Sequence, residues 1–191
     1  MVEQKSYSGY GLTLIPLTKE DLPTILKWRN DERVLKYMMP STPQNLFSIT
    51  FWFNSMKKRT DHRAFMIISD DTNEKIGFIE FKNIHPEKGE GGTASFLNPE
   101  LIGKGVGMRL NFLKEKVYFD LGVSTIIVYL RNVNDRNIHI WERLGAKYIG
   151  MKDDFKIYES TRETRYDAID VISKERGYYD EWRLFRESVM K

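Results

Sequence analysis

The sequence predicts a mixed α/β (α+β) domain with a mostly antiparallel central sheet, flanking helices and a βαβ-like centre. Three observations carry this prediction. Strand-like segments follow one another in the middle of the chain, with connections too short for a crossover helix. A glycine-spaced loop, a helical segment and a buried strand then follow in order, which is typical of a βαβ unit. The length of 191 residues suits one domain, with a core over about 10–175 and a helical tail over about 176–191.

The N-terminal part of the chain is expected to form one strand and then helices. An apolar run at 12–16 indicates the strand. Thr18 and the two acidic residues soon after it indicate the start of a helix. Residues 31–39 indicate a second short helix, ended by a proline. The Thr-Pro pair at 42–43 suits the cap and first turn of a third helix, which is expected to end near Arg59.

The middle of the chain changes to strand patterns at residues 64–69, 75–84 and 93–97. A turn rich in Asp, Thr and Asn separates the first two strands, and glycines loosen the second connection. Because both connections are short, the three strands are expected to form an antiparallel meander.

The last third of the chain alternates between helix and strand patterns. The Gly-rich loop at 103–107 precedes a helix of about four turns that runs to Asp120. A buried strand, a helix ended by Gly145, two late strands and a helical tail are then expected, at residues 124–130, 134–144, 147–155, 164–173 and 178–190.

Composition excludes several classes of function. The chain has 0 Cys, which rules out a disulfide framework, a thiolate zinc site and a cysteine nucleophile, and no metal is expected. The net charge is +3, from 30 basic and 27 acidic residues with interleaved signs, which argues against nucleic acid as the ligand. No apolar run is long enough to span a bilayer, and residues 1–9 hold no signal-peptide core. A cytoplasmic protein without a membrane partner is therefore expected.

The loop Ile102-Gly103-Lys104-Gly105-Val106-Gly107 suits the binding of a phosphate. Its glycines let the backbone approach an anion closely, and N–H groups at a helix N-terminus point toward it. Lys104 adds a positive charge. A Gly-rich loop that only turns the chain would look the same. Neither a P-loop nor a dinucleotide fingerprint fits the alternating glycines, so ATP and NAD are not favoured.

A second segment, residues 134–146, contains Asn134, Asn137 and the run Trp141-Glu142-Arg143-Leu144-Gly145-Ala146. Together with the loop and the opening at 12–31, it resembles the GNAT superfamily of acetyl-coenzyme A dependent N-acetyltransferases. That family shows a Q/R-x-x-G-x-G/A loop, then N-x-x-S/A, then a helix that ends in a Tyr-Glu-Lys-Leu-Gly-Phe type sequence. The chain looks like the subgroup that includes ribosomal-protein N-terminal acetyltransferases and spermidine acetyltransferases, over roughly residues 10–182.

The resemblance implies acetyl-coenzyme A as the cosubstrate. The strand at 95–97 would offer backbone groups to the pantetheine arm, and the loop amides would hold the pyrophosphate. Asn134 would hydrogen-bond the cofactor, and Asn137 would lie beside the thioester. The residues implied in cofactor binding are Ser95, Phe96, Leu97, Ile102, Gly103, Lys104, Gly105, Val106, Gly107, Met108, Asn134, Asn137 and Trp141.

Three positions depart from the family pattern. Ile102 replaces Arg or Gln, so one polar contact to the cofactor is expected to be missing, and Asn137 replaces Ser or Ala. Trp141 stands where many relatives have the Tyr thought to protonate the departing thiolate. Because an indole N–H has no useful acidity at neutral pH, Trp141 is expected to pack along the thioester and not to act as the acid.

Glu80 is the first candidate for the catalytic base. An amine attacks only in its neutral form, and the pKa of an alkyl ammonium group is about 10. The site must therefore help to remove a proton. Glu80 lies in a strand next to the one expected to hold the thioester, and spermidine acetyltransferases carry a similar Glu in a similar strand. A solvated or salt-bridged strand residue is the structural alternative.

Four residues are expected on the acceptor side: Trp28, Arg29, Asn30 and His85. The resemblance implies the first three, although packing explains Trp28 at least as well. His85 follows the strand of Glu80 and could relay a proton, whereas a lone loop histidine is more often simply solvated.

The predicted function is transfer of an acetyl group from acetyl-coenzyme A to a primary amine, by direct attack in a ternary complex. The acceptor stays open among a protein N-terminus, a polyamine and an amino sugar, and a homodimer stays open too. The alternative is a non-catalytic module that binds or senses acyl-coenzyme A, for which Trp141 is the only support. A nucleic-acid modifier would need a basic stripe that the sequence does not show.

Overall fold

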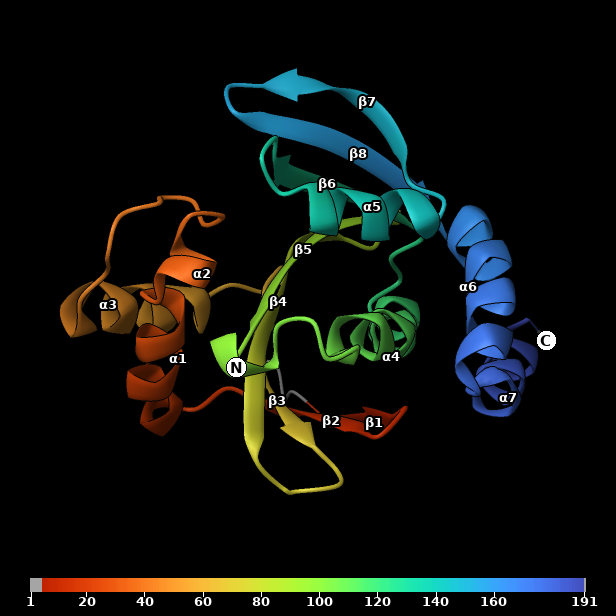
Figure 1. Ribbon diagram of the computed structural model, residues 1–191, viewed down its shortest axis with the longest axis horizontal. Coiled ribbons are helices and arrows are strands. Elements are labelled where there is room, and N and C mark those ends of the chain that lie inside the picture. The colour runs from red at the N-terminus through yellow and green to blue at the C-terminus, as the bar shows by residue number, and fades with distance from the viewer. Residues whose placement is uncertain (1–4, 191) are drawn as a thin grey trace.

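The computed structural model describes residues 5–190 and, within them, one sheet of eight strands (Figure 1). The strands lie in the order β1-β2-β3-β4-β5-β6-β8-β7. Neighbouring strands are antiparallel except for β5 and β6, which are parallel. The predicted mixed, mostly antiparallel sheet is therefore confirmed. The strands are β1 (Tyr7–Gly9), β2 (Leu12–Pro16), β3 (Arg63–Ser69), β4 (Lys75–His85), β5 (Glu90–Leu97), β6 (Thr125–Arg131), β7 (Lys147–Lys152) and β8 (Phe155–Thr161).

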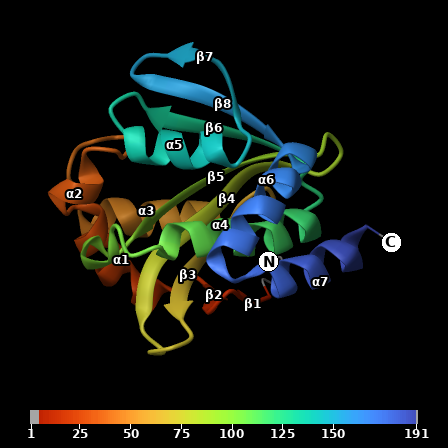
Figure 2. The same ribbon diagram turned by 45° about the vertical axis from the view of Figure 1, so that its right-hand side comes forward.

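Helices cover both faces of this sheet. Three helices lie on one face and the other four gather on the opposite face (Figures 1 and 2). The first group is α1 (Leu22–Arg29), α2 (Glu32–Leu35) and α3 (Leu46–Met56), and the second is α4 (Val106–Asp120), α5 (Asp135–Arg143), α6 (Arg162–Arg176) and α7 (Tyr179–Val189). Two short 3-10 turns, η1 (Lys19–Asp21) and η2 (Pro99–Leu101), precede α1 and the loop before α4.

Each face of the sheet has its own apolar core, because side chains alternate along a strand. In β3, Phe65 and Ile67 join the core under α4, whereas Met66 joins the core under α1 and α3. In β4, Phe78 belongs to the core under α1 and α3. Glu80 is two residues further along the same strand, so it points to the same face as Phe78.

β5 and β6 separate after a short parallel contact. They pair only at Glu90 with Thr125 and at Gly91 with Ile126. Beyond these pairs β5 continues alongside β4, and β6 continues alongside β8. Because the facing edges then have no strand partner, their backbone groups are available to a ligand, and the sheet opens into a wedge.

One predicted element is wrong. Residues 164–173 lie in the helix α6, not in a strand. Thr161 caps this helix by accepting a hydrogen bond from a backbone N–H three residues further on, at 3.3 Å. The buried side chains of Tyr166, Ile169 and Ile172 follow helical spacing. The second late strand is instead β8, which pairs with β7 in a hairpin.

The third helix also begins later than expected. α3 begins at Leu46 and is capped by Asn45 instead of Thr42. The Asn45 side chain accepts from the N–H of Ser48 at 2.9 Å, and the Ser48 hydroxyl accepts from the N–H of Asn45 at 3.1 Å, which satisfies two N–H groups at once. α2 is shorter than the predicted segment 31–39. Within the described part of the chain, no helix is long and apolar enough to cross a membrane.

Candidate functional site

A cleft of about 1680 Å³ lies where β5 and β6 separate. The facing parts of the two strands line it, with residues 92–97 from β5 and 127–131 from β6. The loop before α4, the first half of α4 and α5 form another wall. Residues of α1, of α2 and of the segment that follows α2 line the side of the cleft that is predicted to take the acceptor. The cleft therefore brings together the glycine-spaced loop, the strand predicted to hold the thioester and the helix that carries Trp141.

The glycine-spaced loop enters α4 with unpaired amides. Gly103 and Gly105 have φ angles of +96° and +83°, in the left-handed region that favours glycine. The N–H groups of Gly103, Gly105, Val106 and Gly107 donate no hydrogen bond to any other residue in the range 5–190. Free donors at the N-terminus of a 15-residue helix form a site for an anion. This arrangement fits the pyrophosphate of coenzyme A.

Positive side chains surround the loop. Lys104 and Arg136 line the cleft beside it, and the Arg136 guanidinium is 3.7 Å from the place where a side chain on Gly103 would begin. Lys104 also lines a smaller hollow of about 290 Å³ next to the loop, together with Arg109 and Arg176. Free N–H groups and nearby cations are the two features that polyphosphate binding requires.

The other residues predicted to bind the cofactor lie around the same cleft. Residues 95–97 line it on the edge of β5 that has no strand partner. Asn134 caps α5, and its Oδ1 accepts from the N–H of Asn137 at 3.3 Å; both residues line the cleft. The Val106 side chain is buried in the core under α4, so only its N–H is available to a ligand. The loop residues that line the cleft are Ile102, Gly103, Lys104, Gly105, Gly107 and Met108.

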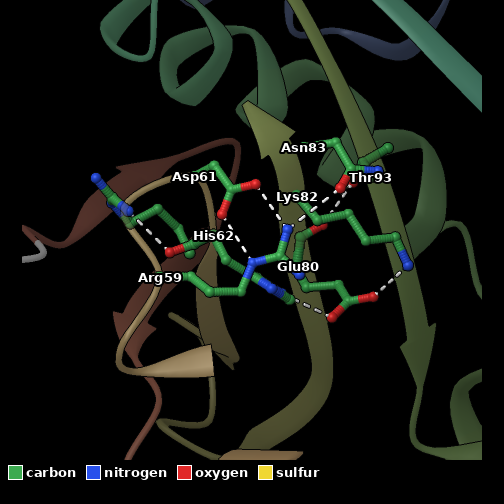
Figure 3. A network of polar contacts seen from close by, with 8 residues as sticks. Arg59, Asp61, His62, Glu80, Lys82, Asn83 and Thr93 are labelled. Atoms are coloured by element: carbon green, nitrogen blue, oxygen red, sulfur yellow. Dashed lines mark hydrogen bonds and ion pairs between the residues drawn. The ribbon is translucent and has the colours of Figure 1, made fainter. Parts of the chain in front are cut away.

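Glu80 lines the cleft and lies within a network of polar contacts (Figure 3). Its Oε2 is 3.0 Å from Nε2 of His62, and its Oε1 is 2.6 Å from Nζ of Lys82. Figure 3 shows these two partners on opposite sides of the carboxylate. The residues beside Glu80 on the neighbouring strands are Ala64 and Ala94, whose small side chains leave the carboxylate room at the cleft wall.

The two partners keep Glu80 ionised. Burial alone would raise the pKa of this carboxyl group. The hydrogen bond with His62 and the positive charge of Lys82 outweigh burial, so that the pKa of Glu80 falls below its usual value. A carboxylate that is ionised at neutral pH can accept a proton from an ammonium group, directly or through water.

Trp141 lines the cleft with a side chain that is 4% exposed. Its ring belongs to the core under α4, and its indole N–H donates no hydrogen bond to any described residue. The ammonium group of Lys114, from α4, lies 5.5 Å from the centroid of this ring. Lys114 lines the cleft too, and its Nζ donates to Oδ1 of Asn111 at 3.0 Å.

The three residues predicted from α1 have different surroundings. Arg29 lines the cleft and donates to two backbone carbonyl oxygen atoms of the segment after α2, at 2.9 and 3.4 Å. Trp28 is buried in the core under α1 and α3, where packing accounts for it. Asn30 bonds the backbone of Gln44 in both directions, at 2.8 and 2.9 Å. Asn30 therefore holds the segment after α2 in place, and Arg29 is the member of the three that lines the cleft.

His62, and not His85, is the histidine beside Glu80. His85 is not among the residues that line the cleft, and its Nδ1 lies 3.4 Å from Glu87. Sequence reasoning missed His62 because it is 18 residues from Glu80 and only the antiparallel pairing of β3 with β4 brings the two together. Within residues 5–190, no group of three His, Asp or Glu side chains is placed to hold a metal ion.

Lys114 was also missed, although the sequence holds a signal for it. Lys114 stands four residues after Leu110 and three before Val117, both of which are buried on α4. These spacings place all three side chains on one helix face. A lysine in the middle of an apolar stripe is therefore buried, and here that stripe continues into the cleft wall.

Comparisons with known proteins identify the arrangement. Residues 11–147 match the family model described as acetyltransferase (GNAT) domain. No curated protein matches the chain. The spermidine N-acetyltransferase of Vibrio cholerae, solved in complex with CoA and spermine, shares 20% identity and a TM-score of 0.72, over 82% of this chain and 99% of that one.

Two further solved structures share the fold. RimL, the ribosomal L7/L12 alpha-N-protein acetyltransferase, solved in complex with coenzyme A, has 13% identity and a TM-score of 0.70, over 84% of this chain and 99% of its own. FdhC, described as a nucleotide-linked sugar GNAT, has 17% identity and a TM-score of 0.76, over 93% of this chain and 99% of its own. At these identities the likeness establishes the fold, and the three named proteins act on different kinds of acceptor.

Proposed function

Because the chain belongs to the GNAT acetyltransferase family, we propose that it transfers the acetyl group of acetyl-coenzyme A to a primary amine, by direct attack in a ternary complex. The observation that carries this proposal is the wedge between β5 and β6, which opens beside a loop with unpaired N–H groups. Acetyl-coenzyme A has an anionic pyrophosphate for such a loop. It also has an extended amide-containing arm, which can pair with an open strand edge.

On the donor side, the loop amides and Lys104 bind the pyrophosphate. The unpaired edge of β5 at residues 95–97 holds the pantetheine arm by backbone hydrogen bonds. Asn137 and Trp141, from α5, lie beside the thioester. The coenzyme supplies the activated acetyl group, and these residues orient its carbonyl carbon toward the acceptor side of the cleft.

On the acceptor side, Glu80 takes up the proton that the attacking amine must lose. Its carboxylate is ionised at neutral pH and lines the cleft. The carboxylate also attracts an incoming ammonium group, which can replace the Lys82 ammonium at Oε1. The ammonium group loses one proton to Glu80, directly or through water, and the neutral nitrogen then forms the bond to the acetyl carbon; the second N–H proton leaves to water as the amide forms.

The charged side chains that line the cleft indicate which kind of acceptor it binds. The carboxylates that line the cleft are Glu80 and Asp153, and Glu80 already has two cationic or hydrogen-bonding partners. Arg29, Lys36 and Lys152 line the same cleft, and none of the three has an ion-pair partner within residues 5–190. A polyamine brings several ammonium groups that each need a carboxylate, and this cleft offers too few.

The acceptor that fits these charges is a primary amine on an anionic carrier, such as a nucleotide-linked amino sugar or a peptide with acidic residues after its N-terminus. Arg29 is suited to this task because its planar guanidinium binds phosphate and carboxylate groups. The amine itself would lie at Glu80, and the anionic part would lie toward Arg29 and Lys36.

The decisive experiment combines calorimetry with an assay of released thiol. Acetyl-coenzyme A is expected to bind the purified protein, and free thiol is expected to appear only when an acceptor is added. The panel would contain a nucleotide-linked amino sugar, the neutral free amino sugar, a peptide with an acidic N-terminal sequence and spermidine. Binding without thiol release from any acceptor would favour a non-catalytic acyl-coenzyme A binding module.

The same panel of acceptors tests whether the positive charge of Arg29 binds the acceptor. Arg29→Gln is expected to raise KM for the anionic acceptor and to leave KM for the neutral amino sugar unchanged. Added salt should have the same effect as the substitution, because it screens exposed charges. Spermidine as the best acceptor would contradict the assignment of an anionic carrier and leave the transferase activity standing.

A further inference from the structure

Lys114 is a buried cation in the wall of the cleft without an anionic partner. It is 5% exposed, and its Nζ donates to the neutral Oδ1 of Asn111 at 3.0 Å. No carboxylate of the described residues lies within ion-pair distance of it. Glu115 is the one acid that influences it, and both oxygens of that carboxylate are bound by Arg165, at 2.7 and 3.2 Å.

An unpaired ammonium in such a place is costly. Burial of a charge without a partner disfavours the charged form, and it lowers the pKa of Lys114 to about 8. A methionine would fill the same space without that cost. Lysines with a structural role usually extend the ammonium into water, whereas the Lys114 ammonium ends beside the ring of Trp141, 5.5 Å from its centroid.

Lys114 lies in the part of the cleft where the proposed function puts the reacting end of the donor. It lies two helical turns beyond Gly107, on the side of α4 that lines the cleft with Leu110 and Asn111. Trp141, beside it, cannot release a proton near neutral pH. Another group must therefore stabilise the negative charge that develops on a departing sulfur. Lys114 is the cation beside Trp141 in the cleft wall.

We propose that the ammonium group of Lys114 contacts the sulfur of coenzyme A and neutralises the thiolate as it departs; this inference rests on the acetyltransferase function proposed above. The acceptor nitrogen forms the new bond to the acetyl carbon, the carbon–sulfur bond breaks, and its electron pair stays on sulfur. Lys114 stabilises that charge and gives a proton to the sulfur. Glu80 holds the first proton that the ammonium group has lost, the second N–H proton leaves to water as the amide forms, and Lys114 regains a proton from water when the products leave.

The test measures binding and titration of the thiol, and so does not depend on turnover. Coenzyme A and desulfo-coenzyme A would be bound to the wild-type protein and to the variants Lys114→Met, Lys114→Arg and Lys58→Met. Lys58 is exposed and lies outside the cleft lining, so Lys58→Met controls for the loss of one charge. The thiolate of bound coenzyme A would be followed by its ultraviolet absorbance as the pH is raised.

The wild-type complex is expected to show an apparent thiol pKa at least about one unit below that of the Lys114→Met complex, as a neighbouring cation produces. Wild-type protein should prefer coenzyme A over desulfo-coenzyme A at pH 8 by roughly threefold more than Lys114→Met does, since the thiol is only partly ionised at that pH and one pKa unit gives its full factor of ten only above both pKa values. Lys114→Arg should keep much of the preference, and Lys58→Met all of it. The melting temperature of Lys114→Met should equal or exceed that of the wild type, because a buried unpaired charge is removed.

Other outcomes would overturn the inference in distinguishable ways. If all variants bind both ligands with the same ratio and the same thiol pKa, Lys114 does not contact the sulfur, while the transferase function stands. A lower melting temperature together with an unchanged ratio would make Lys114 a structural residue. If the wild-type protein binds neither ligand, the proposed function and this inference both fall. Should Lys114→Met not fold, Lys114→Gln, which keeps a polar contact to Asn111, replaces it in the comparison.

Discussion

Oε2 of Glu80 lies 3.0 Å from Nε2 of His62, while Lys82 contacts the other carboxylate oxygen at 2.6 Å. His62 is buried, and its ring meets Trp52 edge to face with 6.1 Å between the ring centroids, so packing holds it in place. The Lys82 side chain is 40% exposed and can turn into solvent. Glu80 therefore has one fixed partner and one that an incoming ammonium group can replace.

Glu80→Gln is expected to lower turnover by about 10² or more at neutral pH, because general-base catalysis contributes on that order. The amide is close in shape to the carboxylate but cannot take up a proton. The affinity for acetyl-coenzyme A should hardly change, since the donor side is untouched. Steady-state kinetics between pH 6 and 9 and calorimetry would measure the two effects separately.

Glu74→Gln is the matched control for that substitution, because Glu74 is exposed just before β4 and does not line the cleft. It should leave turnover and affinity unchanged. Full turnover of Glu80→Gln across the whole pH range would remove Glu80 from the mechanism.

His62→Phe is expected to move the acid limb of the kcat/KM profile to higher pH. The hydrogen bond with His62 helps to lower the pKa of Glu80 against the effect of burial. Without that bond, burial counts for more and the pKa of Glu80 rises, so Glu80 becomes ionised only at higher pH. His62→Gln keeps an N–H donor and should move the limb less; equal shifts in both variants would show that the loss of the ring matters and the hydrogen bond does not.

The residues proposed for the donor half of the site could be picked out from the sequence because they are close together along the chain. The loop at 102–107 and the helix from Asn134 are each local motifs, and their glycines and caps specify backbone shape directly. The acceptor half depends on contacts between distant segments. His62 meets Glu80 through strand pairing, and Arg29 bonds the segment after α2, and no local pattern reports such contacts.

The wrong strand at 164–173 has a related physical cause. Its apolar residues are few and are mixed with charged ones, so an alternating pattern and a helical pattern fit almost equally well. What decides between them is packing: Arg165 reaches the buried carboxylate of Glu115 on α4, and Tyr166 stacks edge to face on Trp182 of α7, with 4.9 Å between the ring centroids. Both contacts require the segment to be a helix that faces α4 and α7.

Gly105→Asp is expected to abolish the binding of acetyl-coenzyme A. It places a negative charge among the N–H groups proposed to hold the pyrophosphate. Gly105 has φ +83° and no heavy atom within 4 Å of an added Cβ, so strain and charge must be separated. Gly105→Ala carries the strain alone, and Gly177→Ala carries the same strain at the end of α6, where φ is +74° and the space is also open. Calorimetry that finds equal affinity in Gly105→Asp and Gly105→Ala would contradict the site.

Glu115→Gln is expected to destabilise the fold by roughly 3–5 kcal/mol, the usual cost of breaking a buried ion pair from one side. Nε of Arg165 lies 2.7 Å from Oε1 of Glu115, and both side chains are 2% exposed, so the substitution leaves a buried guanidinium without its anion. The free energy of unfolding in urea measures the effect. Glu187→Gln removes the exposed pair with Arg183 on α7 and should change stability by less than about 1 kcal/mol. Similar losses of unfolding free energy in the two variants would mean that burial does not make the Arg165–Glu115 pair contribute more than an exposed pair.

The last prediction concerns Trp141, whose ring lines the cleft beside Lys114. Trp141→Phe is expected to keep most of the turnover, because a flat apolar ring remains and the indole N–H makes no hydrogen bond within the described residues. Trp141→Ala should weaken the binding of acetyl-coenzyme A by about 1–3 kcal/mol through lost packing. Kinetics and calorimetry on the two variants distinguish packing from chemistry.

Trp141→Tyr gives the sharpest result when it is combined with Lys114→Met. A phenol and an indole can both donate a hydrogen bond to a departing thiolate. Only the phenol, with a pKa of about 10, can also give it a proton. If Lys114 neutralises the sulfur, Lys114→Met lowers turnover and the added Tyr restores part of it, whereas Trp141→Tyr alone changes turnover less. A coenzyme A thiol titrates near about 8.5 by analogy with Cys, so either group suffices to stabilise it. If Trp141→Phe removes turnover and leaves the affinity for acetyl-coenzyme A intact, the indole N–H is essential, and both the packing role of Trp141 and the charge role of Lys114 are wrong.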